Sequence, residues 1–203
     1  MMKLILNYLQ ITTLWSVVSY CQFDYSQIPQ WHRDYMDNVR RMLNATDKNL
    51  ILYKGQNGIL THNDRICWNS TYAHMALPGV QHKLTFYQKA TKISNKTGEW
   101  YSRTGIYYVG PANNTPMLDL YTKVDGSDDN STSFQYQIYF ATPTCYVIGD
   151  IRRDGVRPAC ALWIQNGTAG QSLPCEWAYE KNCTKIKAKN YTYDESKCKM
   201  LNC

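Results

Sequence analysis

The stretch SFQYQIYFAT, residues 133–142, decides the fold class of this chain. In it Phe134, Tyr136, Ile138 and Phe140 alternate with other residues, which is the period of two that a strand with one buried face requires. Outward from this stretch, similar short runs rich in aromatic and β-branched residues recur between Gly, Pro, Asn and Asp. The predicted strands are 50–54, 65–74, 83–91, 99–109, 117–124, 133–142, 145–151 and 159–164.

Two helices flank these strands. Over residues 30–43, Met36, Val39, Met42 and Leu43 share one face among charged residues, which predicts an amphipathic helix. A second helix is expected around 174–181. Many short strands without intervening helices must close or stack, and eight strands suit an up-and-down barrel that holds one small ligand. We therefore predict an all-β fold: an eight-stranded antiparallel barrel with an N-terminal helix and a disulfide-tied C-terminal helix and tail.

The N-terminus has the layout of a secretory signal peptide. Lys3 precedes an apolar run that reaches Val18, and this run is too short and interrupted to indicate a membrane span. We expect residues 1–21 to be removed, which leaves 22–203 as a single secreted domain and a monomer. Cleavage after Ser19 or Tyr20 would retain Cys21, whereas cleavage after Cys21 would leave seven cysteines.

Cysteines and glycosylation signals support an extracellular location. The chain has eight cysteines without a CxxC pair, and its histidines do not fall at ligand spacing, so we expect disulfides and neither a metal nor a cofactor. Sequons for N-glycosylation occur at Asn44, Asn69, Asn95, Asn113, Asn130, Asn166, Asn182 and Asn190.

The formal net charge is +6, and the distribution of basic residues and the absence of catalytic motifs argue against two other classes of function. The basic residues are scattered, whereas nucleic-acid binding needs a basic patch or stripe. None of the catalytic motifs tested occurs (Gly-x-Ser-x-Gly, HExxH or a phosphate loop), so we do not expect an enzyme.

Alternation within the strands predicts which side chains face the barrel interior. A glycan on Asn69 would have to face solvent, which turns Cys67 outward and Trp68, Tyr72 and His74 inward. The strand 99–109 is ambiguous, because aromatic residues occur on both of its faces. Such a lining could be a plain packed core, but its many Tyr and Trp side chains favour a ligand pocket. The residues predicted to line it are Trp68, Tyr72, His74, Phe86, Ile106, Tyr108, Leu118, Leu120, Phe134, Tyr136 and Ile138.

The C-terminal third carries a family resemblance. Cys145-Tyr-Val, then Cys160-Ala-Leu-Trp163, then Cys175 after eleven residues resembles the signature of tick salivary lipocalins of the histamine-binding family. The N-terminal helix and the cysteine-containing tail are similar as well. The resemblance implies a lipocalin barrel that carries small host mediators: histamine or serotonin in some members, and leukotrienes, fatty acids or cholesterol in others.

The resemblance also implies which class of ligand the barrel binds. The acidic positions of the amine-binding signature are Tyr146 and Ala161 here, and with Trp163 they should face inward and bind the ligand. Burying a cation without a carboxylate is costly. We therefore expect a largely apolar ligand, a sterol or lipid mediator, with its polar head near Tyr146 or His74. This points to the japanin-like, cholesterol-binding branch and to modulation of host immune or inflammatory responses.

Two alternatives stay open. Asp119, Asp150 or Glu99 could supply a carboxylate to the interior, which would make the protein a scavenger of histamine or serotonin. The outer surface could instead bind a host immune-cell or plasma protein.

The family resemblance implies the disulfide pairing Cys67–Cys198, Cys145–Cys175 and Cys160–Cys203. Cys183 would then pair with Cys21, if that residue is retained, or remain a free thiol.

Overall fold

A computed structural model describes residues 25–56, 64–90, 98–128, 133–150, 159–183 and 190–201, except for the side chains of Asp150 and Asn190. The expected signal peptide, Cys21 and Cys203 lie outside the described residues, as do the sequon asparagines Asn95 and Asn130.

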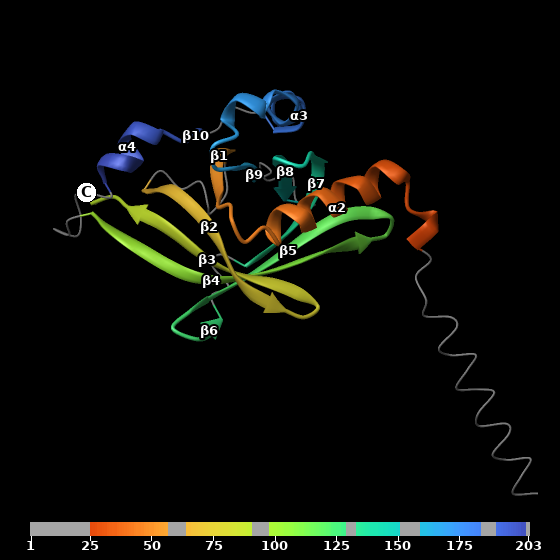
Figure 1. Ribbon diagram of the computed structural model, residues 1–203, viewed down its shortest axis with the longest axis horizontal. Coiled ribbons are helices and arrows are strands. Elements are labelled where there is room, and N and C mark those ends of the chain that lie inside the picture. The colour runs from red at the N-terminus through yellow and green to blue at the C-terminus, as the bar shows by residue number, and fades with distance from the viewer. Residues whose placement is uncertain are drawn as a thin grey trace, which may run out of the picture.

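Eight antiparallel strands close into a barrel, as predicted (Figure 1). Each strand pairs with the next along the chain, and the last pairs with the first, so the sheet closes on itself. Two short strands, β6 (Ser127–Asp128) and β10 (Asn190–Thr192), are added to the sheet by pairing with β5 and β1. The barrel strands are β1 (Leu50–Gln56), β2 (Arg65–Ala76), β3 (Gly79–Gln88), β4 (Glu99–Ala112), β5 (Thr115–Val124), β7 (Phe134–Ala141), β8 (Cys145–Asp150) and β9 (Cys160–Gln165).

The N-terminal helix forms where the amphipathic pattern predicted it. After a short turn of 3-10 helix, η1 (Tyr25–Gln27), α2 (Gln30–Leu43) packs against β4, β5, β7 and β8. Its apolar face is fully buried in the same core as the interior of the barrel. Asn38 Nδ2 also donates to the carbonyl oxygen of Ala141 at 3.3 Å, which ties α2 to the end of β7.

The C-terminal elements lie on the outside of the barrel (Figure 1). After η3 (Ala169–Gln171), α3 (Leu173–Cys183) contacts β7, β8 and β9 and covers a second, smaller apolar cluster on their outer faces. The last helix, α4 (Glu195–Met200), begins at Asp194, whose side chain accepts a hydrogen bond from the backbone N–H of Lys197. None of the described helices is long and apolar enough to cross a membrane.

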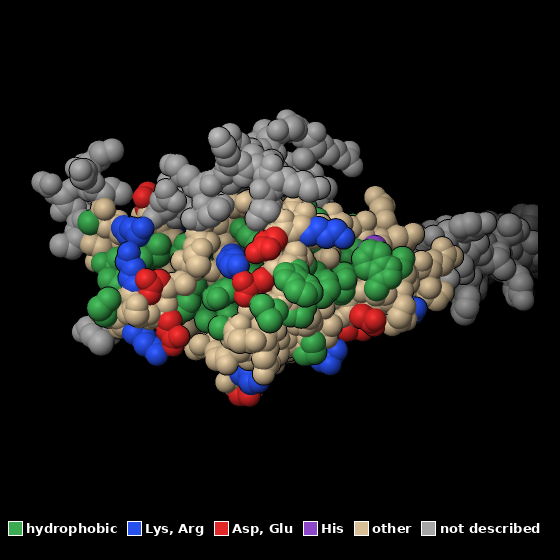
Figure 2. All heavy atoms as spheres, turned by 90° about the horizontal axis from the view of Figure 1, so that it is seen from above, with side chains coloured by type: hydrophobic (Ala, Val, Ile, Leu, Met, Phe, Trp, Pro, Cys, Tyr) green, Lys and Arg blue, Asp and Glu red, His purple; other side chains and the backbone are tan. Residues whose placement is uncertain are grey.

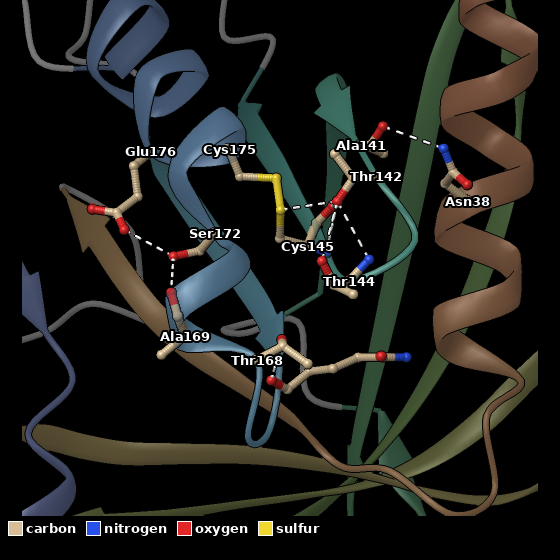
Figure 3. The surroundings of a disulfide bond; sticks show 11 residues. Asn38, Ala141, Thr142, Thr144, Cys145, Thr168, Ala169, Ser172, Cys175 and Glu176 are labelled. Atoms are coloured by element: carbon tan, nitrogen blue, oxygen red, sulfur yellow. Dashed lines mark hydrogen bonds between the residues drawn. A yellow bond between two sulfur atoms is a disulfide. The ribbon is translucent and has the colours of Figure 1, made fainter.

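Three disulfides between cysteines in the described part of the chain hold these C-terminal elements. Cys67–Cys198 and Cys145–Cys175 agree with the predicted pairing, and Figure 3 shows the second of them beside the Thr142 hydroxyl. The predicted Cys160–Cys203 bond is wrong, because Cys160 is bonded to Cys183. Cys160 begins β9 in the cluster beneath α3, and Cys183 ends α3 directly over it. Cys183 is therefore neither a free thiol nor a partner for Cys21.

The tail strand β10 completes one part of the barrel wall. One edge of β1 pairs with β9 along its length. On the other edge, β2 pairs only with the first two residues of β1, and β10 pairs with Lys54, Gly55 and Gln56. The backbone N–H of Cys67 donates to the hydroxyl of Tyr191 at 3.0 Å, which bridges β2 and β10. The C-terminal tail thus fills the space where β1 and β2 diverge.

Charged side chains are interspersed on the described part of the face shown in Figure 2. Lys and Arg side chains lie beside Asp and Glu side chains there, with apolar side chains between them.

Candidate functional site

The barrel interior contains most of the side chains that alternation placed there. The pairing register is consistent around the wall, because residues directly opposite each other share a face: Leu84 with Ser70, Leu118 with Tyr136, and Tyr146 with Trp163. Tyr72 and Phe134 are half-buried and pack against the same core. The predicted lining residues that are fully buried are Trp68, Phe86, Leu118, Leu120, Tyr136, Ile138, Tyr146, Ala161 and Trp163.

The ambiguous strand β4 has the opposite orientation to the one predicted. Val80 faces inward and pairs with Tyr107, so Tyr107 is the buried residue. Ile106 and Tyr108 are therefore on the outer face, and their assignment to the pocket is wrong. The Tyr108 ring packs edge-on against Tyr121, which is 51% exposed.

His74 also lies outside the interior, contrary to the prediction. The pairing of β2 with β3 shifts between Tyr72 and His74, and an irregularity of this kind breaks the simple alternation of faces. His74 is exposed near the end of β2, so it cannot receive the polar head of a ligand in the barrel.

The interior contains a buried hydrogen-bond network that was not predicted from the sequence. His82 Nε2 lies 2.7 Å from the carbonyl oxygen of Leu43, and His82 Nδ1 lies 2.8 Å from Ser70 Oγ. A carbonyl can only accept, so Nε2 carries the proton and the Ser70 hydroxyl donates to Nδ1. The Tyr107 hydroxyl, at 3.2 Å, then donates to Ser70 Oγ. Burial lowers the pKa of His82, which favours the neutral ring that this network requires.

Strand alternation could have identified this network. Ser70 is two residues from Trp68, and His82 is two residues from Leu84, so both share the inward face with residues recognised as apolar lining. They were missed because a search for apolar residues passes over polar ones at inward positions.

Trp68 Nε1 and the Tyr146 hydroxyl, both in the interior, have no hydrogen-bond partner among the described residues. Both side chains are completely buried. Each buried polar group left without a hydrogen bond lowers the stability of the folded protein by about 1–3 kcal/mol. Burial also raises the pKa of Tyr146 well above its usual range, so its hydroxyl stays neutral. The interior therefore presents two neutral donors to whatever acceptor reaches them.

Aromatic and basic side chains meet around Phe86. The Trp68 ring stacks on Phe86 with centroids 4.2 Å apart. The guanidinium carbons of Arg65 and Arg103 lie 5.4 and 5.5 Å from the Phe86 centroid, within the range of cation–π attraction.

None of the described carboxylates faces the interior. Asp119 pairs with Tyr108 on the outer face of the sheet, and Glu99 is exposed and accepts a hydrogen bond from the Tyr101 hydroxyl. Asp150 ends β8, and its side chain is outside the described part of the structure. The described residues likewise contain no group of three or more side chains that could hold a metal ion.

Comparisons with known proteins place this barrel in a family. The family model described as tick histamine binding protein matches residues 31–200. A search of curated proteins finds no match. Among solved structures, the chain is similar to japanin from Rhipicephalus appendiculatus bound to cholesterol, with 16% identity and a TM-score of 0.51 over 76% of this chain and 97% of that one. At this identity the likeness shows the fold alone, but the family model covers most of the sequence. The chain therefore belongs to the tick histamine-binding protein family and folds as a lipocalin.

Proposed function

We propose that the protein is a secreted salivary lipocalin whose barrel holds one small, largely apolar ligand with a single neutral polar group. A sterol or a lipid mediator fits this description, and its sequestration would modulate host immune or inflammatory responses. The observation that carries the proposal is the pair of buried, unpartnered donors, Trp68 Nε1 and the Tyr146 hydroxyl, in an interior whose buried lining is mainly apolar apart from the Ser70–His82–Tyr107 network. The cholesterol bound to japanin, a protein of the same fold, supports it.

Entry of the ligand requires side chains to move. The lining residues pack against one another with little exposed surface, so a ligand must displace some of them. Trp68 and Tyr146 are suited to this, because no hydrogen bond to another described residue holds either polar group in place. When they turn toward a ligand oxygen, each gains a hydrogen bond with a net value of about 0.5–1.5 kcal/mol.

The same interior disfavours a biogenic amine. An ammonium group would have to leave water, at a cost of several kcal/mol, without a described carboxylate to receive it. Asp150 is the residue through which amine binding could still arise, since the backbone of β8 pairs it with Tyr136.

The test is to identify what the protein carries. Protein secreted from eukaryotic cells is analysed by native mass spectrometry before and after extraction into organic solvent, and histamine binding is measured by calorimetry. We expect a bound lipid mass that disappears on extraction, and no saturable heat with histamine. Absence of any bound lipid, together with sub-micromolar histamine binding that Asp150→Asn abolishes, would establish an amine scavenger instead.

A further inference from the structure

A groove of about 450 Å³ lies outside the barrel, between the outer face of β2, β3 and β4 and the C-terminal tail. Asn69, Thr85 and Ser102 lie side by side across the three strands, because the register pairs Asn69 with Thr85 and Thr85 with Ser102. The disulfide between Cys67 and Cys198 joins the groove to the tail. The groove is lined by Ile51, Cys67, Asn69, Lys83, Thr85, Trp100, Tyr101, Ser102, Tyr193 and Cys198.

The chemistry of this groove differs from that of the barrel interior. Trp100 and Tyr193 contribute aromatic rings, while Lys83, Thr85 and Ser102 contribute an ammonium group and hydroxyls. Trp100 is 37% exposed, although its Nε1 donates to the carbonyl oxygen of Leu201 in the tail. Sugar rings have apolar C–H faces and a rim of hydroxyl groups. Aromatic rings next to small polar side chains therefore suit a saccharide better than a lipid.

One residue that lines the groove is itself a potential attachment site for a saccharide. Asn69 is the acceptor of the sequon Asn69-Ser70-Thr71, and the Thr71 hydroxyl donates to Asn69 Oδ1 at 3.4 Å. Among the sequon asparagines whose side chains are described, Asn44, Asn113, Asn166 and Asn182 are exposed, whereas Asn69 is half-buried. A sugar attached to Asn69 starts inside the groove, and its short tether gives it a high effective concentration there.

We propose that Asn69 is glycosylated and that the first N-acetylglucosamine residues of this glycan occupy the groove. In this position the sugar lies against Trp100 on the barrel side and Tyr193 on the tail side, with Lys83 and Ser102 within the same groove to bind its hydroxyls. The glycan thereby holds residues 190–201 against the barrel, in addition to the Cys67–Cys198 disulfide.

The test compares variants that remove the glycan in different ways. Asn69→Gln and Thr71→Ala both destroy the sequon but change different side chains, while Thr71→Ser keeps it. Glycopeptide mass spectrometry measures occupancy, and hydrogen exchange of amides 190–201 measures how firmly the tail is held. We expect an occupied Asn69 and at least tenfold faster tail exchange in both Asn69→Gln and Thr71→Ala, with wild-type exchange in Thr71→Ser. Trimming the glycan to its first sugar should preserve the slow exchange.

Release of the glycan from native protein gives a second readout. We expect an amidase to release it from Asn69 more slowly than from Asn44, and Trp100→Ala to reduce that difference. The proposal is overturned if Asn69 is unoccupied, if its glycan is released as fast as that on Asn44, or if the tail exchanges equally in wild type and Thr71→Ala. An unoccupied Asn69 in the wild-type protein, together with binding of added N-acetylglucosamine oligosaccharides by Thr71→Ala, would also overturn the proposal, because the sugar in the groove would then come from another source.

Discussion

The wall formed by β2, β3 and β4 has two faces with opposite chemistry. Its inner face contains Trp68, Leu84 and Phe86, and there Ser70 and His82 belong to a buried network while Trp68 Nε1 lacks a partner among the described residues. Its outer face contains Asn69 and Thr85, next to a groove open to solvent. Since neighbouring residues of a strand alternate between the faces, one wall can present an apolar site and a polar site back to back.

The two faces also differ in how they are held. The inner face relies on packing and on the contact of His82 with the carbonyl of Leu43 at the end of α2. The outer face is held to the tail by Cys67–Cys198, and Cys67 lies at a bulge with a φ of 58°. This difference predicts which changes affect which side of the wall.

The largest effect is expected from removing the disulfide of the outer face. Cys67→Ala/Cys198→Ala opens a loop of 131 residues, whereas Cys160→Ala/Cys183→Ala opens one of 23 residues. On the chain-entropy model these changes lower the free energy of unfolding by about 5 and about 3 kcal/mol, respectively. Urea unfolding of both double variants measures the difference. Equal losses would show that the long-range tie between tail and barrel has no special role.

The next effect concerns His82 on the inner face and depends on pH. Burial lowers its pKa in the folded protein, so below about pH 6.5 only the unfolded chain takes up the proton. The free energy of unfolding should therefore fall as pH decreases below 6.5, by up to about 1.4 kcal/mol per pH unit, until pH drops below the folded pKa. Above that window His82 contributes no pH dependence.

Unfolding of His82→Gln across this pH range provides the check. The variant is expected to be less stable than wild type at pH 8 by about 1–3 kcal/mol, because the Ser70 and Leu43 groups lose a partner, but to lack the His82 contribution to the slope. His74→Gln is the matched control, since His74 is exposed. A slope that persists unchanged in His82→Gln would contradict the assignment.

Two tyrosine hydroxyls of the interior should have effects of opposite sign. Tyr146→Phe removes an unpartnered buried hydroxyl and should stabilise delipidated protein by about 1 kcal/mol. Tyr107→Phe removes a hydroxyl that donates to Ser70 and should destabilise it by about the same amount. Thermal unfolding distinguishes the two, and sterol affinity should fall up to tenfold only in Tyr146→Phe. The same sign in both variants would mean that Tyr146 has a partner after all.

The smallest effect is expected at the ion pair between β1 and α3. Burial raises the pKa of Glu176, but hydrogen bonds from Lys54, at 2.6 Å, and Ser172 outweigh it and hold that pKa below its usual value. Lys54→Met should cost at most about 1 kcal/mol, because the pair is partly exposed. The wild-type advantage should be present above about pH 4.5 and be lost as pH falls through the lower folded pKa. NMR titration of Glu176 checks this, and an unchanged midpoint in Lys54→Met would contradict it.

Alternation and turn chemistry predict the barrel well because they are local. The strand 133–142 and the helix 30–43 each carry their own period, and both elements form close to the predicted bounds. Predictions fail where the outcome depends on distant elements. The face of Tyr107 depends on the register with Val80, and the position of His74 depends on a shift in the pairing of β2 with β3. The partner of Cys160 depends on where α3 ends.

The measurement that tests the interior site most directly is photocrosslinking with a cholesterol analogue that carries a diazirine. Delipidated protein is irradiated with the probe, and labelled peptides are mapped by mass spectrometry. We predict saturable labelling of inward residues such as Trp68, Phe86 and Trp163, competed by unlabelled cholesterol. Labelling confined to Trp100 and Tyr193 in the outer groove, or labelling that cholesterol does not compete, would contradict a lipid site inside the barrel.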